Sequence, residues 1–377
     1  MSHTIRIAKK VYYEKKLEEA KSSAKQTWKI LNEVLNKRSS NRKISCNLKL
    51  GNKELTDPKS IAEQFCKYFS NIGPALANNI SATSVSHRSF LSGNVLESLF
   101  LDSVSEQEVI EICKSLKSGT AVGYDNVFVD LVKQCAHLII IPLTHIINTS
   151  IVSGILPDEL TIACVIPLFR SEDRSLFTNY RPVSVLPAFS KLFERAIYNR
   201  LLSYLDKHKV LSYSQFGFRK NHSTEYALTL FCEKISTAID NKEISVGIFI
   251  DLSKAFDTVN HEMLLDKLRY FGIRGVAYNW FASYLNNRQQ FVQFNDTSSS
   301  RHVIKCGVPQ GSILGPLLFL LYINDLCNVS QVLDFILFAD DTNTFFSHKD
   351  KDILERTMND ELLKLTGWCL ANKLSIN

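Results

Sequence analysis

Two short apolar runs, each followed closely by aspartate, constrain this 377-residue chain more than any other feature. The run 246–250 ends at Asp251, and the run 335–338 is followed, after one residue, by the pair Asp340–Asp341. Because a further apolar run follows at 344–346, the sequence predicts a hairpin with the aspartate pair at its tip. If strand 246–250 lies beside this hairpin, three carboxylates meet at one edge of a small sheet.

Such a cluster of carboxylates indicates bound cations. Two unit charges about 4 Å apart repel each other by roughly 4 kcal/mol at an effective dielectric constant of 20. Oxygen ligands favour Mg²⁺, and two such ions can activate an attacking hydroxyl and stabilise a leaving phosphate. The alternative is an ordinary solvated turn, since aspartate is common in turns.

Helical and extended patterns alternate irregularly around these strands, which predicts an α+β fold with a small antiparallel sheet packed on helices. One helix should begin at Pro58 after the N-cap Asp57, and another after Ser105, which forms a capping box with Glu108. Further helices are expected at 9–38, 192–205, 228–239, 261–270, 276–286, 313–326 and 352–368, and a hairpin should join 291–294 to 303–306.

The first 43 residues are strongly basic. They hold 12 Lys and Arg against 4 Asp and Glu, whereas the rest of the chain holds 32 against 34. An excess of this kind is typical of segments that bind a polyanion, most often nucleic acid. A solvated, charged helix within a linker is the alternative.

Other features of the sequence bear on the cellular compartment. The longest uninterrupted apolar run, 313–323, has 11 residues, whereas a membrane-spanning helix needs about 20. The first ten residues contain no apolar stretch typical of a signal peptide. The nine cysteines lie at least 20 residues apart, so neither a CxxC zinc site nor a disulfide scaffold is predicted. We expect an intracellular protein, nuclear or cytoplasmic, that is not secreted and does not contact a membrane.

Five segments between residues 180 and 341 carry recognisable motifs. They are Tyr180-Arg-Pro-Val-Ser184, Gln215-Phe-Gly-Phe-Arg-Lys-Asn-His-Ser-Thr224, Phe249-Ile-Asp-Leu-Ser-Lys-Ala-Phe-Asp257, Gly307-Val-Pro-Gln-Gly-Ser-Ile-Leu-Gly-Pro316 and Phe338-Ala-Asp-Asp341. In this order they resemble the motifs of reverse transcriptases, specifically those of non-LTR retrotransposons of the jockey or CR1 kind. The resemblance covers about residues 105–377 and implies an RNA-directed DNA polymerase that adds dNTPs to a DNA primer on an RNA template.

The resemblance also implies the fingers and palm of a right-hand polymerase fold, preceded by a helical extension. Residues 1–104 would form the basic helical extension or linker, 105–245 a fingers-like region, and 246–377 the palm with the catalytic motifs. Relatives continue to a lysine-containing motif and a thumb, and carry an endonuclease upstream. The resemblance therefore implies a piece of a longer element that stops before its thumb.

By the same resemblance, Asp251, Asp340 and Asp341 are the expected catalytic and metal-binding residues. They would hold two Mg²⁺ ions, for which Mn²⁺ can substitute, while a primer 3′-hydroxyl attacks the α-phosphorus of a dNTP. Asp251 and Asp340 would bridge the ions, whereas Asp341 would act chiefly through its charge.

A set of nucleotide and template contacts follows from the resemblance. Phe256 would be the steric gate that leaves no room for a ribose 2′-hydroxyl, and Gln310 would line the sugar and base. Arg181 would grip triphosphate oxygens, with Arg170 where relatives often carry lysine. The other expected nucleotide contacts are the backbone of Leu252, Ser253, Lys254 and Ala255, and the expected template or primer contacts are Arg219, Lys220 and Gly311.

Two other functions stay open at this point. Asp257 gives the motif around Asp251 a second carboxylate, which is compatible with an RNA-dependent RNA polymerase, whereas Phe256 and the Pro-Gln-Gly turn favour a DNA polymerase. A non-catalytic RNA-binding remnant would account for the basic segment and the missing thumb. Asp257, Asn260 and His261 are otherwise interpreted as structural residues.

Overall fold

The computed structural model describes residues 2–21, 23–34, 47–51, 53–81 and 83–377, and it divides into two compact units, Met1–Cys46 and Asn47–Asn377. In the first unit, α1 (Ser2–Glu19) is followed by α2 (Ala24–Val34), and Lys16 Nζ lies 3.3 Å from Glu33 Oε2. The single helix expected over 9–38 is therefore wrong. Trp28 of α2 is 63% exposed, and residues 35–38 lie outside the described residues.

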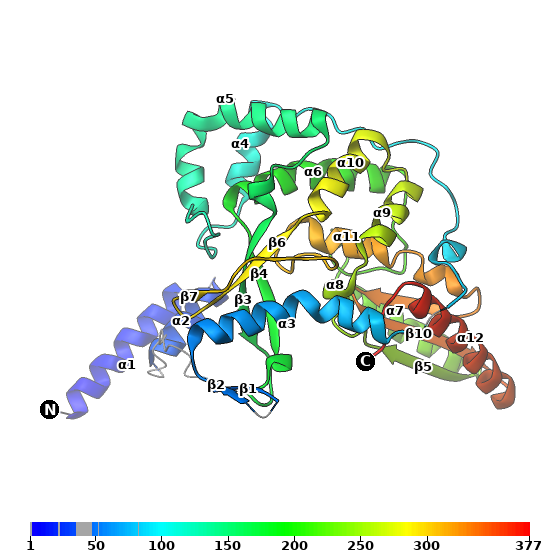
Figure 1. Ribbon diagram of the computed structural model, residues 1–377. Coiled ribbons are helices and arrows are strands. Elements are labelled where there is room, and N and C mark those ends of the chain that lie inside the picture. The colour runs from blue at the N-terminus through cyan, green and yellow to red at the C-terminus, as the bar shows by residue number, and fades with distance from the viewer. Residues whose placement is uncertain (1, 22, 35–46, 52, 82) are drawn as a thin grey trace. The chain divides into compact units, whose positions relative to one another are not determined.

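The second unit combines helices with small sheets (Figure 1). Its helices are α3 (Pro58–Asn79), α4 (Glu106–Ser115), α5 (Val129–Ser153), α6 (Ala188–Lys207), α7 (Thr224–Asp240), α8 (Ala255–Thr258), α9 (His261–Tyr270), α10 (Gly275–Leu285), α11 (Leu314–Tyr322) and α12 (Lys351–Ala371), with the short turns η1 (His87–Phe90), η2 (Asp158–Thr161), η3 (Phe177–Asn179) and η4 (Leu326–Val329). Its strands are β1 (Leu48–Leu50), β2 (Lys53–Leu55), β3 (Ile162–Phe169), β4 (Tyr180–Val185), β5 (Ile244–Ile250), β6 (Gln289–Phe294), β7 (Thr297–Ser298), β8 (His302–Val303), β9 (Asp334–Phe338) and β10 (Asp341–His348). This mixture of helices and small sheets agrees with the expected α+β class.

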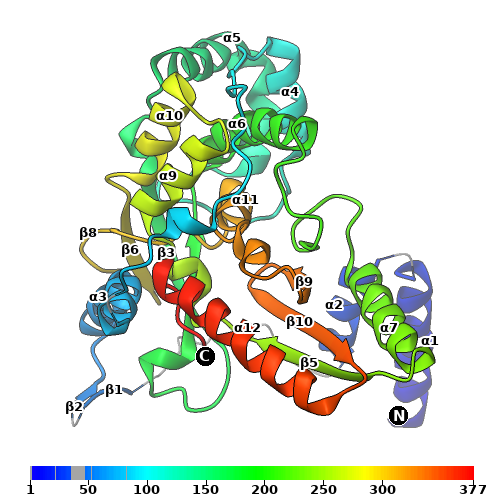
Figure 2. The ribbon, with the colours of Figure 1, turned by 90° about the vertical axis from the view of Figure 1, so that its right-hand side faces the viewer.

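A three-stranded antiparallel sheet, in the order β5–β10–β9, contains both aspartate-ended strands. β9 and β10 form the predicted hairpin, and Thr342 pairs with Ile250, so β5 lies directly beside β10. Side chains alternate along β10, so that Phe345 packs with residues of α7 while Phe346 packs against the main core. The sheet is covered by α7 on one face and by α12 on the other (Figure 2).

A five-stranded sheet joins β4, β3, β6 and β7 in that order, with β8 also paired to β6. β3 is antiparallel to β4 but parallel to β6, a pairing that the sequence did not predict. The hairpin expected between 291–294 and 303–306 turns earlier, because Asn295 adopts φ 53° and β7 pairs back onto β6 at once.

α3 belongs to the second unit, although the sequence pattern placed residues 1–104 apart. Asp57 caps this helix as predicted and accepts a hydrogen bond from Ser60 N at 2.8 Å. The fully buried ring of Phe65 contacts Phe177 and Tyr180, with ring centroids 4.8 and 5.0 Å away. Because α3 also packs along β6, the boundary between the compact units falls after Cys46.

Most of the other predicted helices are confirmed, including α6, α9, α10, α11 and the Ser105-capped α4. Two details differ. In α7, the buried residues are Ala227 and Ala238, whereas Leu228 and Ile239 are 61% and 66% exposed, because small side chains let the helix approach the sheet closely. In α12, the cap is Asp350, which comes before the expected start.

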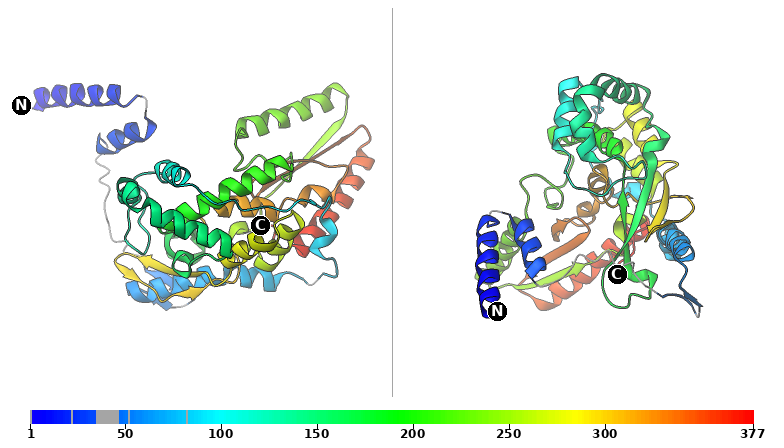
Figure 3. Two further views of the ribbon diagram at one scale, coloured as in Figure 1. Left: turned by 90° about the horizontal axis from the view of Figure 1, so that it is seen from above. Right: turned by 90° about the vertical axis from the view of Figure 1, so that its left-hand side faces the viewer.

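The main core lies where α6, α10 and α11 meet. Buried Glu194 of α6 links them, because it accepts hydrogen bonds from the Tyr284 hydroxyl at 2.9 Å and from Ile313 N at 2.5 Å. Burial raises the pKa of Glu194. The cyan-to-green helices α4, α5 and α6 pack together beside this core (Figure 3).

Within the described residues, α5 alone is long and apolar enough to cross a membrane by length and composition. It was missed by a count of uninterrupted apolar runs, because residues such as Lys133 and His137 interrupt it. Val132, Ile140 and Ile147 of this helix are buried against neighbouring helices, and buried core helices pass the same test.

Candidate active site

The turn between β9 and β10 has two residues, Ala339 and Asp340, because Phe338 pairs with Asp341. Ala339 adopts φ 56°, a left-handed conformation that costs free energy in residues other than glycine. Buried Gln215 holds this turn, since its Oε1 accepts from Ala339 N at 2.9 Å and its Nε2 donates to Ala339 O at 3.3 Å. Asp340 is thereby presented at a fixed point.

Asp251 follows directly after β5, next to the last β5–β10 pair. Its backbone carbonyl accepts from Asn377 N at 2.8 Å, and its carboxylate accepts from Asn377 Nδ2 at 2.8 Å. The segment 375–377 therefore runs beside residues 251–253, and it orients the Asp251 side chain.

Asp251 and Asp340 line one cavity of about 330 Å³, together with Asp257. Burial raises the pKa of Asp340, and the nearby charges of Asp341 and Asp251 raise it further. Carboxylates that repel one another in this way have negative charge that a divalent cation would neutralise. One or two carboxylates completed by phosphate oxygens and water are a typical Mg²⁺ site, so the donor set fits that ion.

Cationic side chains from other elements line the same cavity: Arg170 after β3, Arg181 on β4 and Lys254 before α8. Burial lowers the pKa of Lys254, the charges of the two arginines lower it further, and Asp257 opposes the shift. Three carboxylates and three cations around one cavity suit a ligand that carries both phosphate groups and metal ions.

The ring of Phe256 also lines this cavity. It stacks on buried Phe319 of α11 at a centroid distance of 4.4 Å, and it meets Phe218 edge-on at 6.1 Å. Two aromatic neighbours thus fix the position of the ring at the wall of the cavity.

The loop 307–311 places Gln310 at the cavity. Ser184 N donates to Gln310 O at 2.8 Å, and Gln310 Nε2 donates to Asp257 Oδ1 at 2.8 Å. Gly311 adopts φ 124°, and a Cβ there would lie 2.5 Å from Ser184 O, so this position requires glycine.

The structure thus brings most of the predicted nucleotide contacts around one cavity, but not every predicted site residue. Asp341 lines, with Asp251, an adjacent apolar groove of about 580 Å³ on the α7 side of the sheet. Within the described part of the chain, three or more His, Cys, Asp or Glu side chains nowhere gather closely enough to hold a metal ion. The cavity therefore presents two of the three predicted ligands.

Of the predicted template contacts, Gly311 follows Gln310 in the loop at the cavity, whereas Arg219 and Lys220 do not line the cavity. Arg219 Nη1 donates to Ser212 O at 2.7 Å and to Gln215 O at 3.2 Å, so the guanidinium braces the segment that holds the Ala339 turn. Lys220 is exposed. The side chains of Asn260 and His261 have structural roles: Asn260 Oδ1 accepts a hydrogen bond from Met263 N at the start of α9, and His261 Nε2 hydrogen-bonds to Gly307 O.

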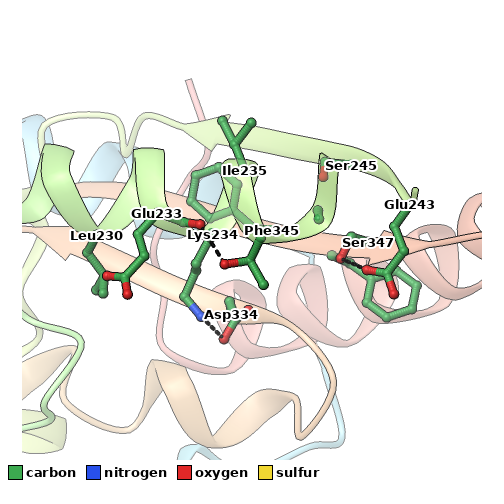
Figure 4. Close-up of a pocket in the computed structure, with 12 residues that line it drawn as sticks. Leu230, Glu233, Lys234, Ile235, Glu243, Ser245, Asp334, Phe345 and Ser347 are labelled. Atoms are coloured by element: carbon green, nitrogen blue, oxygen red, sulfur yellow. Dashed lines mark hydrogen bonds and ion pairs between the residues drawn. The ribbon is translucent and has the colours of Figure 1, made fainter. Parts of the chain in front are cut away.

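Another hollow, of about 320 Å³, lies between α7 and the far end of β10 (Figure 4). Lys234 Nζ pairs with Asp334 at 2.7 Å, and the Ser347 hydroxyl donates to Glu243 at 2.9 Å. Glu233 adds a further carboxylate to its lining, so this hollow would repel a triphosphate.

Sequence reasoning missed two residues that hold the site: Gln215, which clamps the turn before Asp340, and Asp257, which binds the side chain of Gln310. Both lie inside motifs, but their partners are more than 50 residues away in sequence. A lone sequence offers no signal for such pairs beyond the presence of a polar residue among apolar ones.

Comparisons with known proteins show which family this chain resembles. The family described as reverse transcriptase (RNA-dependent DNA polymerase) matches residues 172–377. The probable RNA-directed DNA polymerase from transposon BS of Drosophila melanogaster is 31% identical over 294 residues, which cover 74% of this chain and 32% of that protein. The RNA-directed DNA polymerase from mobile element jockey of Drosophila melanogaster is 32% identical over 268 residues, covering 69% and 29%.

A more distant relative is the Pol polyprotein from type-1 retrotransposable element R2 of Popillia japonica, which is 25% identical over 216 residues. The chain spans about a third of the length of the first of these curated relatives. More than half of the chain matches the family, and the relatives belong to non-LTR elements. The chain therefore belongs to the reverse transcriptases of non-LTR retrotransposons.

Proposed function

We propose that this chain carries an RNA-directed DNA polymerase core, which adds dNTPs to a DNA primer on an RNA template. The observation that carries the proposal is the cavity in which Asp251 and Asp340 share the lining with Arg170, Arg181 and Lys254. The names of the relatives, which are RNA-directed DNA polymerases of mobile elements, support the same reaction.

Asp251 and Asp340 are the residues that would hold divalent metal, with Asp341 adding negative charge nearby. Bound Mg²⁺ ions supply activation of the primer hydroxyl and neutralisation of the leaving pyrophosphate. The protein contributes position: Gln215 fixes the turn that carries Asp340, and Asn377 orients Asp251. Such positioning is a large part of catalysis in phosphoryl transfer.

The cations and the ring of Phe256 would bind the nucleotide. Arg181, Arg170 and Lys254 would pair with triphosphate oxygens, since guanidinium and ammonium groups form strong hydrogen bonds with phosphate. Phe256, held by Phe319, would lie where a ribose 2′-hydroxyl would otherwise fit. In this proposal the five-stranded sheet belongs to the fingers and the three-stranded sheet to the palm, so residues 289–303 join the fingers although the expected palm, 246–377, included them.

The test is Mg²⁺-dependent extension of oligo(dT) on poly(rA) with dTTP by the full chain. We expect activity in the parent, and a loss of at least about 100-fold in Asp340→Asn, because a neutral amide cannot replace the charge. Asp334→Asn, at the opposite end of β9, is the matched control and should keep parental activity. Equal extension by parent and Asp340→Asn would indicate a contaminating polymerase, and no extension by either would favour an RNA-binding remnant.

A further inference from the structure

We propose that Asp257 is a positioning residue that fixes the side-chain amide of Gln310, with the amide oxygen turned toward the nucleotide. This inference rests on the proposed function and deepens it. It concerns how the nucleotide is recognised in the cavity that Gln310 and Asp257 both line.

Only one oxygen of the Asp257 carboxyl has a hydrogen-bond partner among the described residues. Its Oδ1 accepts from Gln310 Nε2 at 2.8 Å, whereas its Oδ2 is buried and has no hydrogen-bond partner among the described residues. A buried carboxyl oxygen without a partner is costly. The carboxyl is therefore poorly explained as a purely structural group, since an apolar residue of similar shape would fill the same space without that cost.

The orientation of the Gln310 amide follows from its bond to Asp257. An ionised carboxylate can only accept, so the NH₂ side of the Gln310 amide must face Asp257. The amide is planar, so its oxygen then points away from Asp257. No described residue donates to that oxygen, and Gln310 lines the cavity, so the oxygen is open to a hydrogen-bond donor on a bound ligand.

The backbone around Gln310 is held in place by hydrogen bonds of its own. Ser184 N holds its carbonyl at 2.8 Å, and Gly311 packs against Ser184 with no room for a Cβ. Gly307 N and Val308 N bind the carbonyls of Val259 and Phe256, at 2.7 and 2.9 Å. With the backbone fixed, the hydrogen bond to Asp257 determines whether the oxygen or the NH₂ group of the Gln310 amide points toward the nucleotide.

Protonation of Asp257 provides an independent test of this orientation. A protonated carboxyl can donate a hydrogen bond to the oxygen of the Gln310 amide, which would leave the NH₂ group pointing toward the nucleotide. Burial raises the pKa of Asp257 to about 6, while Lys254 and Arg181 lower it and the hydrogen bond from Gln310 also lowers it. Other titratable or charged groups also face this carboxyl or line the cavities that it lines: Tyr68, Cys306, Arg288, Arg170, Asp251 and Asp340.

The test compares the KM for dTTP and kcat in primer extension by full-length variants. Asp257→Leu and Gln310→Leu should each raise KM about tenfold with little change in kcat, as expected for loss of one hydrogen bond to the nucleotide. The double variant should be no worse than Gln310→Leu alone, because Asp257 acts through Gln310. Losses that multiply in the double variant would overturn the proposal.

A second measurement covers the case in which Asp257→Leu does not fold. In the parent, KM for dTTP should rise as pH falls through about 6, and Gln310→Leu should lack that part of the rise. Identical pH profiles of KM in the parent and in Gln310→Leu would overturn the proposal. A rise in KM at low pH that is present in the parent and absent from Gln310→Leu supports it.

The proposed function and this inference can fail separately. If the parent does not extend primers, binding of dTTP with Mg²⁺ is measured by calorimetry for the same variants. The inference is supported, independently of polymerase activity, if the parent binds dTTP, if each single substitution weakens this binding, and if the double variant binds no more weakly than Gln310→Leu. An affinity that is unchanged by these substitutions, or no binding by the parent, overturns it.

Discussion

The ring of Phe256 is positioned by its own neighbours rather than by a ligand. It stacks on Phe319 at 4.4 Å and meets Phe218 edge-on, so it keeps its place at the wall of the cavity. Truncation of this side chain would open space beside the sugar of a bound nucleotide.

Phe256→Ala should reduce discrimination between dNTP and rNTP by about tenfold or more, because the excluded volume at the sugar is removed. The measurement is the ratio of kcat/KM for dTTP and UTP on poly(rA)/oligo(dT). Phe319→Leu is a companion variant, since it removes the stacking but retains the Phe256 side chain, and it should reduce discrimination less than Phe256→Ala does. If Phe256→Ala discriminates between dTTP and UTP as well as the parent does, Phe256 is not the steric gate.

Ionised Asp257 should lower the free energy of unfolding of the protein at neutral pH. Burial raises its pKa from 3.8 to about 6, so the folded state binds the proton more tightly than the unfolded state. The stabilisation from that proton is complete below the unfolded pKa, and it is lost as pH rises through about 6.

The free energy of unfolding of the parent should therefore fall relative to that of Asp257→Asn, by roughly 2 kcal/mol between pH 4 and pH 7. Denaturant unfolding of both proteins across this range provides the measurement, and groups common to both cancel in the difference. A difference that does not change with pH would show that Asp257 is not buried as a charged group.

At the scale of elements, the hairpin β9–β10 depends on a contact with a distant segment. Gly217 lies against the turn so closely that a Cβ would meet Ala339 N at 2.2 Å and its Cα at 2.9 Å. Backbone atoms cannot move aside as a flexible side chain can. Gly217 and Gln215 therefore fix the turn from one side.

Gly217→Ala should displace this turn and lower the extension rate by at least about 100-fold, since small misplacement of reacting groups is costly. Its partner control is Gly367→Ala in α12, where an added Cβ meets nothing within 4 Å and activity should be unchanged. Primer extension measured beside the melting temperature separates displacement of the turn from general unfolding. Parental activity in Gly217→Ala would contradict the close contact.

The sequence predicted local features of the elements well. Capping residues such as Asp57 and Ser105 act within one turn, and the apolar runs at β5 and β9 are contiguous, so one stretch of sequence contains the whole signal. The five-stranded sheet depended instead on the parallel pairing of β3 with β6, which no local pattern encodes.

The candidate site divides in the same way. Motifs indicated Asp251, Asp340, Phe256 and Gln310, and the structure places all four around one cavity. The motifs did not indicate that Arg219 binds the backbone at Ser212, because that contact depends on how the chain folds back.

At the scale of the whole molecule, the basic residues of the first unit are set apart from the cavity-bearing unit in sequence. Residues 1–43 carry a net charge of +8, although residues 35–43 lie outside the described part of the chain. We propose that this segment binds nucleic acid through phosphate contacts, as its charge predicts.

Removal of residues 1–46 leaves the second compact unit whole, so it is the appropriate truncation. Its affinity for an RNA–DNA hybrid should fall about tenfold at 100 mM salt, and the slope of log affinity against log salt should become shallower. Fluorescence anisotropy across a salt series gives both quantities. An unchanged affinity and slope would show that the basic residues are merely solvated.

The parallel pairing of β3 with β6 has a consequence for biosynthesis. Ile162 leaves the ribosome roughly 130 residues before its partner Gln289, which at typical translation rates is a delay on the order of ten seconds. During that interval one edge of an apolar strand lacks its neighbour and can pair with other nascent chains. We therefore expect the growing polypeptide to be a chaperone client until β6 emerges, and to be prone to aggregation when it is synthesised without one.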